Sequence, residues 1–216
     1  MYKYFIWDFD GTLFDTYPHM SSALKKALKD FSVDESMEEI LEHMKKSVTI
    51  AINYYAKKYN LETHELAYQY RQYERYGDKS KVKPYPGAKE VCQKIKKMGG
   101  YNYLYTHRDM SAWHYLQQFG FDKYFSDFIT GEDNFPGKPA PDAILHLIDK
   151  HNMQKEKVLM IGDRDIDILA GYNAGVEGCL FDPDSFYDQF DVKYRVHTMK
   201  EFESIISELF HKKEVS

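Results

Sequence analysis

Apolar and polar positions follow two different patterns along this chain of 216 residues. From about residue 14 to about residue 81, apolar side chains recur every three or four positions, which predicts helices only. From Pro84 onward, short apolar runs alternate with stretches of helical spacing, which predicts strands and helices in turn. The first apolar run, Tyr4 to Trp7, is aromatic and β-branched, as expected for a strand buried on both faces.

The helical segment contains four predicted helices, each with its apolar residues on one face. They begin near Pro18, at Met37 after the capping pair Ser36 and Glu39, near Val48, and near Thr63. A stiff turn over residues 84–87, Pro-Tyr-Pro-Gly, then indicates a domain boundary. Beyond it, strands are predicted over residues 101–106, 128–130, 158–161 and 176–181, with helices between them and a closing helix over residues 202–210.

This order of elements predicts the fold class. Strands that alternate with helices form βαβ units and a mostly parallel sheet, and the first strand belongs to that sheet. We therefore expect an α/β protein with a Rossmann-like, three-layer core made of residues 1–13 and 84–216. Residues 14–83 would form a small all-helical domain inserted after the first strand.

Composition narrows the possible functions. Hydrophobic residues make up 43% of the chain and charged residues 29%, as in an ordinary soluble protein, and the net charge is −5. This balance argues against a nucleic-acid partner, because such binding relies on many lysines and arginines. The early first strand leaves no room for a signal peptide, and no apolar run has membrane-spanning length, so we expect a cytoplasmic protein without a membrane partner. The two cysteines, Cys92 and Cys179, are expected to be reduced buried thiols.

Polar residues gather where the predicted strands end, which is where ligands bind in an open parallel sheet. Asp8 and Asp10 follow the first strand, and their side chains would point the same way if the strand continued. Taken alone, this pair could be no more than an acidic turn. The other strand ends carry Thr106-His107-Arg108-Asp109, Gly137-Lys138-Pro139 and Gly162-Asp163-Arg164-Asp165-Ile166-Asp167.

These residue types suit two ligands. Carboxylates bind hard cations such as Mg²⁺, which usually takes one or two protein carboxylates together with a substrate phosphate. A lysine, a hydroxyl and the backbone N–H groups of strand-to-helix turns suit a phosphoryl group. The sequence therefore predicts a site for a metal and a phosphate.

The same residues resemble the four motifs of the haloacid dehalogenase-like hydrolase superfamily. The motifs occur in the right order, and the resemblance covers nearly the whole chain. The inserted helices resemble the cap domain of the branch that contains phosphoglycolate phosphatase and β-phosphoglucomutase. The matching residues are Asp8-Phe9-Asp10-Gly11-Thr12-Leu13, Thr106, Lys138 in Gly-Lys-Pro-Ala-Pro, and Gly162-Asp163 with Asp167.

The resemblance implies a role for each motif residue. Asp8 would be the nucleophile that becomes an aspartyl phosphate, and Asp10 would be the general acid and base. Thr106 would hydrogen-bond the phosphoryl oxygens, and Lys138 would neutralise Asp8 and the transferring group. Mg²⁺ would bind Asp8, the Asp10 backbone carbonyl and Asp163, with Asp167 touching or supporting the metal. The implied substrate-binding residues are Gly11, Thr12, Thr106, His107, Arg108 and Lys138.

Simpler interpretations exist for several of these residues. Lys138 could be a solvated surface lysine, Asp163 a helix N-cap, and Asp167 the surface partner of a nearby arginine. His107 replaces an asparagine that is frequent after the threonine motif, which leaves its side-chain role open. Arg108 could bind a second anionic group of the substrate or lie on the surface.

The function expected from this resemblance is a Mg²⁺-dependent phosphatase of small phosphorylated metabolites. A phosphomutase of the β-phosphoglucomutase type shares the catalytic residues and remains an alternative, and a non-catalytic regulatory module on the same fold is another. Dehalogenation would leave Asp10 and the acidic fourth motif unexplained. The sequence does not identify the substrate or the oligomeric state.

Overall fold

The computed structural model describes residues 1–210, and the chain forms two compact units. The sheet unit consists of Met1–Phe14 together with the chain from Pro84 onward, and the helical unit is Asp15–Lys83. Among the described residues, no helix is both long and apolar enough to cross a membrane.

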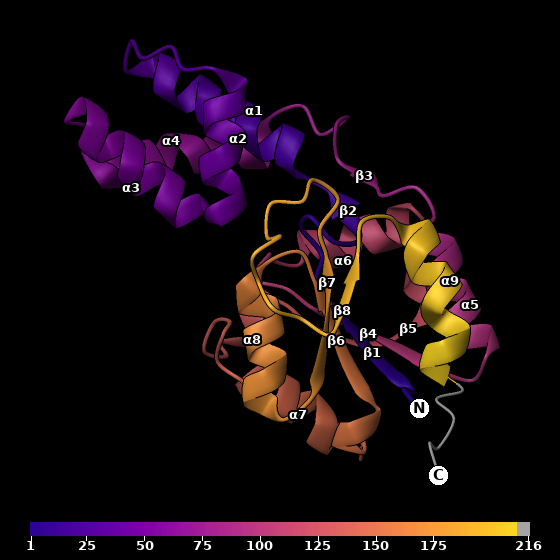
Figure 1. The fold of residues 1–216 in the computed structure, drawn as a ribbon. Helices are drawn as coiled ribbons and strands as arrows, with labels where there is room; N and C mark the ends of the chain where they lie inside the picture. Colours follow the sequence, from indigo (N-terminus) through magenta and orange to yellow (C-terminus); the bar gives the residue numbers. More distant parts are fainter. Residues whose placement is uncertain (211–216) are drawn as a thin grey trace. The chain divides into compact units, whose positions relative to one another are not determined.

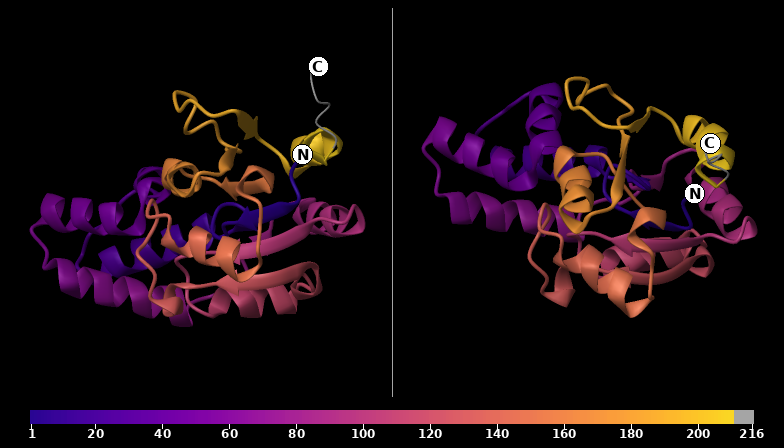
Figure 2. Two further views of the ribbon diagram at one scale, coloured as in Figure 1. Left: turned by 90° about the horizontal axis from the view of Figure 1, so that it is seen from below. Right: turned by 60° about the horizontal axis from the view of Figure 1, so that its bottom comes forward.

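The sheet unit is built around six parallel strands, in the order β5-β4-β1-β6-β7-β8 (Figure 1). The two views of Figure 2 show β1 in the interior of this sheet. Two strands of this six-stranded sheet differ from prediction: β5 begins three residues earlier than expected, and β8 was not predicted. The bounds are β1 Tyr4–Trp7, β4 Tyr101–Tyr105, β5 Phe125–Ile129, β6 Val158–Gly162, β7 Glu177–Phe181 and β8 Tyr194–Val196.

Helices cover both faces of the sheet and give the three-layer α/β fold that the sequence predicts. Ile6 of β1 packs in a cluster with residues of α7 (Asp142–Lys150) and α8 (Asp165–Ala174). On the opposite face, Phe5 stacks on Phe210 and Trp7 packs against Phe202, both from α9 (Met199–Phe210), which lies beside α5 (Ala88–Lys97). Successive residues of β1 are therefore buried on alternate faces, which explains its continuous apolar composition.

Strand β1 lies at the point where the order of the sheet reverses. Its neighbours are β4 on one side and β6 on the other, and Trp7 is in register with both Leu104 and Ile161. In parallel sheets, a ligand binds in the crevice at the carboxyl ends of the strands on either side of such a point. The topology thus places the residues after β1, β4 and β6 around one location.

Three further elements lie outside the six-stranded sheet. Helix α6 (Ser111–Gln118) lies between β4 and β5 in the chain. The short strands β2 (Phe14–Asp15) and β3 (Lys83–Pro84), which were not predicted, pair in a separate small sheet where the chain passes from one unit to the other. Cys92 and Cys179 are free and buried, as predicted.

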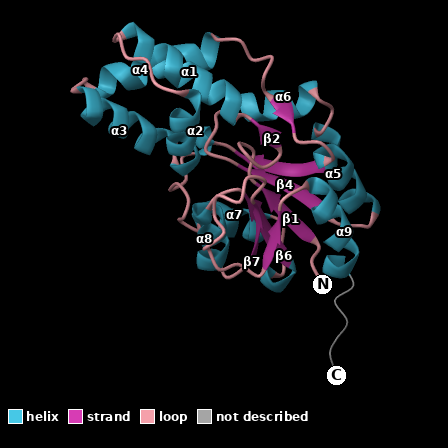
Figure 3. Cartoon of the chain, turned by 45° about the horizontal axis from the view of Figure 1, so that its top comes forward, coloured by secondary structure: helices cyan, strands magenta, loops and turns pink. Residues whose placement is uncertain are grey.

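The helical unit consists of four helices around their own core (Figure 3). Their bounds are α1 Tyr17–Asp30, α2 Met37–Lys46, α3 Val48–Tyr59 and α4 Thr63–Tyr76, as the apolar spacing predicts. At the start of α2, the Ser36 hydroxyl accepts the backbone N–H of Glu39, which is half of the expected capping box. The Glu39 side chain instead pairs with Lys58.

Candidate functional site

The chain leaves the sheet immediately after β1. The backbone N–H of Asp8 still donates to the carbonyl of Ile161, 2.8 Å away, but the next residues form a tight turn. The carbonyl of Phe9 accepts from the N–H groups of Leu13 and Phe14, and Gly11 has a φ of +76°, which favours glycine. The strand does not continue to Asp10, so the Asp10 side chain need not point in the same direction as that of Asp8.

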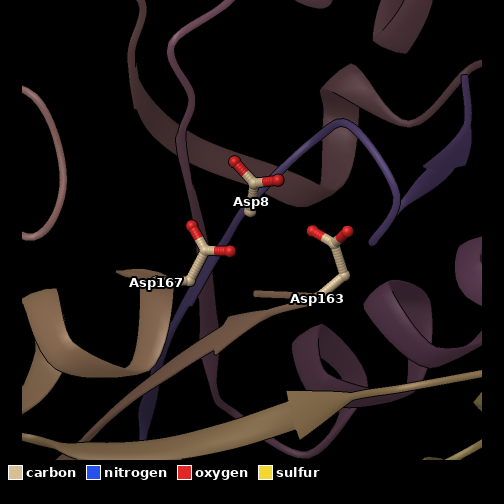
Figure 4. Close-up of side chains that lie close together, drawn as sticks. All are labelled: Asp8, Asp163 and Asp167. Carbon is tan, nitrogen blue, oxygen red and sulfur yellow. The ribbon is translucent and has the colours of Figure 1, made fainter. Parts of the chain in front are cut away.

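Three carboxylates from two strand ends meet beside the turn (Figure 4). They belong to Asp8, Asp163 and Asp167, and one oxygen from each lies within 4.8 Å of the others. All three residues are buried, with 2%, 8% and 0% of their surfaces exposed. Asp163 directly follows β6, and Asp167 lies in the first turn of α8. Residues separated by about 155 positions thus form one acidic cluster, which could hold a metal ion.

Lys138 lies within this cluster and not on the surface. Its side chain is completely buried, and its Nζ lies 2.6 Å from Asp8 Oδ1 and 2.7 Å from Asp167 Oδ1. The other oxygen of Asp167 accepts the backbone N–H of Arg164, 3.0 Å away. Asp167 is therefore an internal residue, which excludes the surface pair considered from sequence. Asp163 is not the N-cap of α8 either, because Arg164 occupies that position.

Two buried oxygens of the cluster have no hydrogen-bond partner among the described residues, Asp167 Oδ1 and Asp8 Oδ2. Asp167 Oδ1 still lies 2.7 Å from the Lys138 ammonium, whereas the Asp8 oxygen that lies close to this ammonium is Oδ1 and not Oδ2. A buried polar atom without a partner is costly unless a ligand satisfies it. A cation or an electrophilic phosphorus atom could fill this role at Asp8.

The electrostatics of the cluster show a shortage of positive charge. Burial raises the pKa of Asp8 to about 6, because the attraction of Lys138 only partly offsets the loss of water. Burial acts in the same direction on Asp167, but the charges of Lys138 and Arg164 outweigh it and hold its pKa below the usual value. Burial would lower the pKa of Lys138, but Asp167 and Asp8 outweigh it and raise that pKa. One ammonium thus neutralises one of its two carboxylate partners, and a bound cation would compensate the other.

The carboxylate of Asp10 lies outside this cluster and is bound by Arg108. The Arg108 Nε donates to Asp10 Oδ1 at 2.9 Å, and its other guanidinium nitrogen lies 2.8 Å from the same oxygen. The guanidinium also lies 5.9 Å from the centre of the Phe9 ring. Only 10% of the Arg108 side chain is exposed, so it is not the surface arginine that the sequence left possible.

The hydroxyls of Thr106 and Thr12 have different partners. Thr106 is buried at the end of β4, and its Oγ1 accepts the backbone N–H of Arg108 at 3.1 Å. The O–H of the same group can donate to a phosphoryl oxygen. Thr12 donates its hydroxyl to Asp163 Oδ1 at 3.3 Å, so its side chain serves a carboxylate of the cluster.

Tyr105, the last residue of β4, and His107, two residues later, contact Lys138, and the sequence did not predict these contacts. The side chain of His107 accepts the backbone N–H of Lys138 at its Nε2, at 2.8 Å. The ring of Tyr105 lies next to the ammonium, with 4.6 Å from Nζ to the ring centre. The available signal was the alternation of the predicted strand, which would place residues 105 and 107 on one face if the strand continued, but β4 ends at Tyr105. Sequence alone could not show that the Lys138 loop covers that face.

Comparison with known proteins places the chain in a family. The family model described as haloacid dehalogenase-like hydrolase matches residues 5–181. A phosphoglycolate phosphatase of Photobacterium profundum is 30% identical over 213 residues, which cover 87% of this chain and 92% of that protein. A pyrophosphatase of Halalkalibacterium halodurans is 27% identical, covering 66% of this chain and 68% of the relative. The crystal structure of a hydrolase from Streptococcus pneumoniae has a similar fold, with a TM-score of 0.66, 24% identity and coverage of 95% of this chain and 98% of that one. The chain therefore belongs to the haloacid dehalogenase-like hydrolases.

Proposed function

We propose that this protein is a Mg²⁺-dependent phosphatase that hydrolyses small phosphorylated metabolites through an aspartyl phosphate on Asp8. The observation that carries the proposal is the state of the Asp8 carboxylate. One of its oxygens is paired with buried Lys138, and the other is buried without a hydrogen-bond partner among the described residues. A carboxylate held on one side and open on the other is suited to in-line attack on phosphorus.

The reaction proceeds in two steps. In the first, a carboxylate oxygen of Asp8 forms a bond to phosphorus, the bond to the leaving alkoxide breaks, and Asp10 donates a proton to that alkoxide. In the second, Asp10 takes a proton from water, the water oxygen attacks phosphorus, and the bond to Asp8 breaks to release phosphate. Thr106 donates its hydroxyl to a phosphoryl oxygen, and Lys138 offsets the negative charge of the transferring group. Arg108 orients the Asp10 carboxylate through the contacts seen here.

The residues present fit a magnesium ion. The donors are carboxylate oxygens, which Mg²⁺ prefers, and one oxygen each of Asp8, Asp163 and Asp167 lie within 4.8 Å of one another in the acidic cluster. Asp8, Asp163 and the Asp10 backbone carbonyl would hold the ion. When bound, it would neutralise phosphate charge and fix the substrate relative to Asp8. Asp167 has both oxygens engaged, with Lys138 and with the Arg164 N–H, so we assign it a supporting role.

Substrate class and cap function belong to the same proposal. The helical unit Asp15–Lys83 is inserted in the chain between the two parts of the sheet unit. We propose that it is a cap domain that selects the substrate. The relatives named as phosphoglycolate phosphatase and pyrophosphatase support small, strongly anionic phosphate compounds as substrates. A cytoplasmic location and the absence of a nucleic-acid partner stay predictions.

The test is phosphate release from p-nitrophenyl phosphate with Mg²⁺ and with a chelator. A panel with phosphoglycolate, pyrophosphate, sugar phosphates and nucleotides then identifies the substrate. Turnover that requires Mg²⁺ supports the proposal, whereas isomerised sugar phosphate without released phosphate would indicate the phosphomutase. If the protein is folded and still reacts with none of these compounds, the result would favour the non-catalytic regulatory module.

A further inference from the structure

The buried ammonium of Lys138 is held by more than its two carboxylates. An ammonium has three N–H groups, and the carboxylates of Asp8 and Asp167 lie within ion-pair distance of Nζ. The aromatic face of Tyr105 lies beside the same Nζ, 4.6 Å from ring centre to nitrogen. The surroundings of the ammonium therefore consist of two anions and one ring.

Tyr105 is placed there by the register of the sheet. Ile6 of β1 is paired with Tyr103 of β4, so the next residues on the same face, Asp8 and Tyr105, are also neighbours. The Tyr105 ring is 2% exposed, and its hydroxyl has no hydrogen-bond partner among the described residues. Because the hydroxyl makes no such contact, the ring itself accounts for the interaction of Tyr105 with the site.

His107 holds the backbone of the same lysine. Its Nε2 accepts the Lys138 N–H at 2.8 Å, which requires a neutral ring with its proton on Nδ1. The desolvation of the ring and the nearby Lys138 charge lower the pKa of His107 to about 4, which keeps it neutral near pH 7. A Cβ at Gly137 would lie 3.3 Å from this Nε2, so glycine leaves room for the close approach. The rings of Tyr105 and His107 lie edge to face, with their centres 6.2 Å apart.

We propose that Tyr105 and His107 form an aromatic clamp that positions Lys138 throughout the catalytic cycle. The proposal rests on the phosphatase function proposed above. When Asp8 becomes an acyl phosphate, its oxygen bound to Lys138 loses the full carboxylate charge. The face of Tyr105 and the acceptor of His107 do not change during the reaction, so they keep the ammonium beside the phosphoryl group in both steps. Both residues act through Lys138 and are positioning residues.

The first test separates the ring face of Tyr105 from its bulk. Phenylalanine with zero to three fluorine atoms is introduced at position 105, which weakens the attraction of the ring for a cation with little change in size. We expect Tyr105→Phe to keep kcat for p-nitrophenyl phosphate within about threefold, because the face remains. Successive fluorines should then lower kcat stepwise, and Tyr105→Leu should lose about 10- to 100-fold with a smaller change in KM. A flat series would overturn the role of Tyr105.

The matched control is Tyr103→Leu. Tyr103 is an equally buried tyrosine on the same face of β4, and its ring packs against Tyr4 and His151 instead of Lys138. This variant should lower the thermal midpoint while leaving kcat near the wild-type value. If it lowered kcat as much as Tyr105→Leu does, the effect would be one of general packing and the clamp would be refuted.

The second test concerns His107. His107→Gln keeps a side-chain acceptor near the Lys138 N–H, and His107→Leu removes it, so we expect rescue by glutamine and at least a 10-fold lower kcat with leucine. Equal kcat values for the two variants would overturn this half of the clamp. The affinity of the protein for inorganic phosphate in the presence of Mg²⁺ should weaken along both series. Calorimetry measures this affinity without any turnover. If wild-type protein binds phosphate but hydrolyses nothing, the proposed function fails while this binding series still tests the clamp.

Discussion

The carboxylates of Asp8 and Asp10, two positions apart, have different partners. Asp8 contacts Lys138 inside the acidic cluster, whereas Asp10 contacts Arg108 outside it. We predict that Asp8→Asn forms no covalent intermediate. Asp10→Asn should keep its fold and lower turnover of an alkyl phosphate by a factor on the order of 10² to 10⁴, as for loss of a general acid and base. Steady-state kinetics and mass spectrometry for one added phosphoryl group measure both effects.

An activated substrate sharpens this comparison. The leaving group of p-nitrophenyl phosphate needs little protonation, so Asp10→Asn should slow the first step less than hydrolysis of the aspartyl phosphate. Phosphoryl-enzyme should then accumulate on Asp8. Near-normal turnover by Asp8→Asn, or unchanged turnover of an alkyl phosphate by Asp10→Asn, would show that the assigned roles are wrong.

The Asp8 carboxylate also affects stability in the absence of metal. Its pKa is raised to about 6 in the folded protein from an ordinary value of 3.8, so its contribution to stability is fully present below pH 3.8 and is lost as the pH rises through 6. Above pH 6 its charge is therefore destabilising, by up to about 3 kcal/mol. Asp8→Asn should be more stable than wild type at pH 8 in a chelator, because Lys138 keeps Asp167 as its partner.

Urea unfolding at pH 8 and pH 4.5 measures this difference. The advantage of Asp8→Asn should shrink at the lower pH, where wild-type Asp8 is largely protonated. A variant that is less stable than wild type at pH 8 would mean that the ion pair with Lys138 outweighs the cost of burial.

For individual residues, the sequence predicts which side chains carry the chemistry better than it predicts the contacts that these side chains make. Asp8, Lys138, Asp163 and Asp167 meet because strand ends meet, and this follows from topology. The pairing of Asp10 with Arg108 depends on the turn at Gly11, whose path is set by backbone hydrogen bonds that residue type alone does not specify.

Among the elements, β6 and α8 depend on Gly162 for their close approach. A Cβ at Gly162 would lie 2.2 Å from the Cβ of Asp167, far inside normal contact distance. We predict that Gly162→Ala displaces the first turn of α8, disturbs the contact between Asp167 and Lys138, and lowers kcat at least 10-fold. Enzyme kinetics together with thermal unfolding detect the change.

Gly99→Ala serves as the control for this variant. Gly99 has a φ of +83°, but a Cβ there would meet no atom within 4 Å. Alanine should strain the backbone and lower stability by about 1 kcal/mol while leaving kcat unchanged. Loss of activity in both variants would indicate that reduced stability, and not the position of Asp167, explains the effect of Gly162→Ala.

The elements that the sequence predicts well are those with a strong apolar pattern. The four helices of the helical unit and the strands β1, β4, β6 and β7 have such patterns. The helices begin at or within one residue of the predicted positions, and the bounds of the strands agree closely with prediction. Strand β8 was missed because Tyr194, Arg195 and Val196 are too few and too mixed to show a period. It is recognisable only from its pairing with β7.

At the scale of the whole molecule, the candidate metal site exists only in the folded chain. Asp8 and Asp163 come from distant parts of the sequence and meet through the sheet. A ligand that binds only the folded state stabilises it, by about 2.7 kcal/mol at a concentration 100 times its dissociation constant. For a chain of this length, we predict that saturating Mg²⁺ raises the thermal midpoint by roughly 5 to 10 °C.

The ligand set decides which variants lose this response. Asp163→Asn should remove most of the Mg²⁺-dependent increase in midpoint, because it weakens a proposed ligand. Asp165→Asn should keep the increase, since Asp165 lies outside the acidic cluster and asparagine can still accept the Ile166 N–H that Asp165 accepts at 2.8 Å. Scanning calorimetry with and without Mg²⁺ measures both, at equal ionic strength. An equal increase in wild type and Asp163→Asn would show that the stabilising ion binds elsewhere, and the assignment of Asp163 would have to be abandoned.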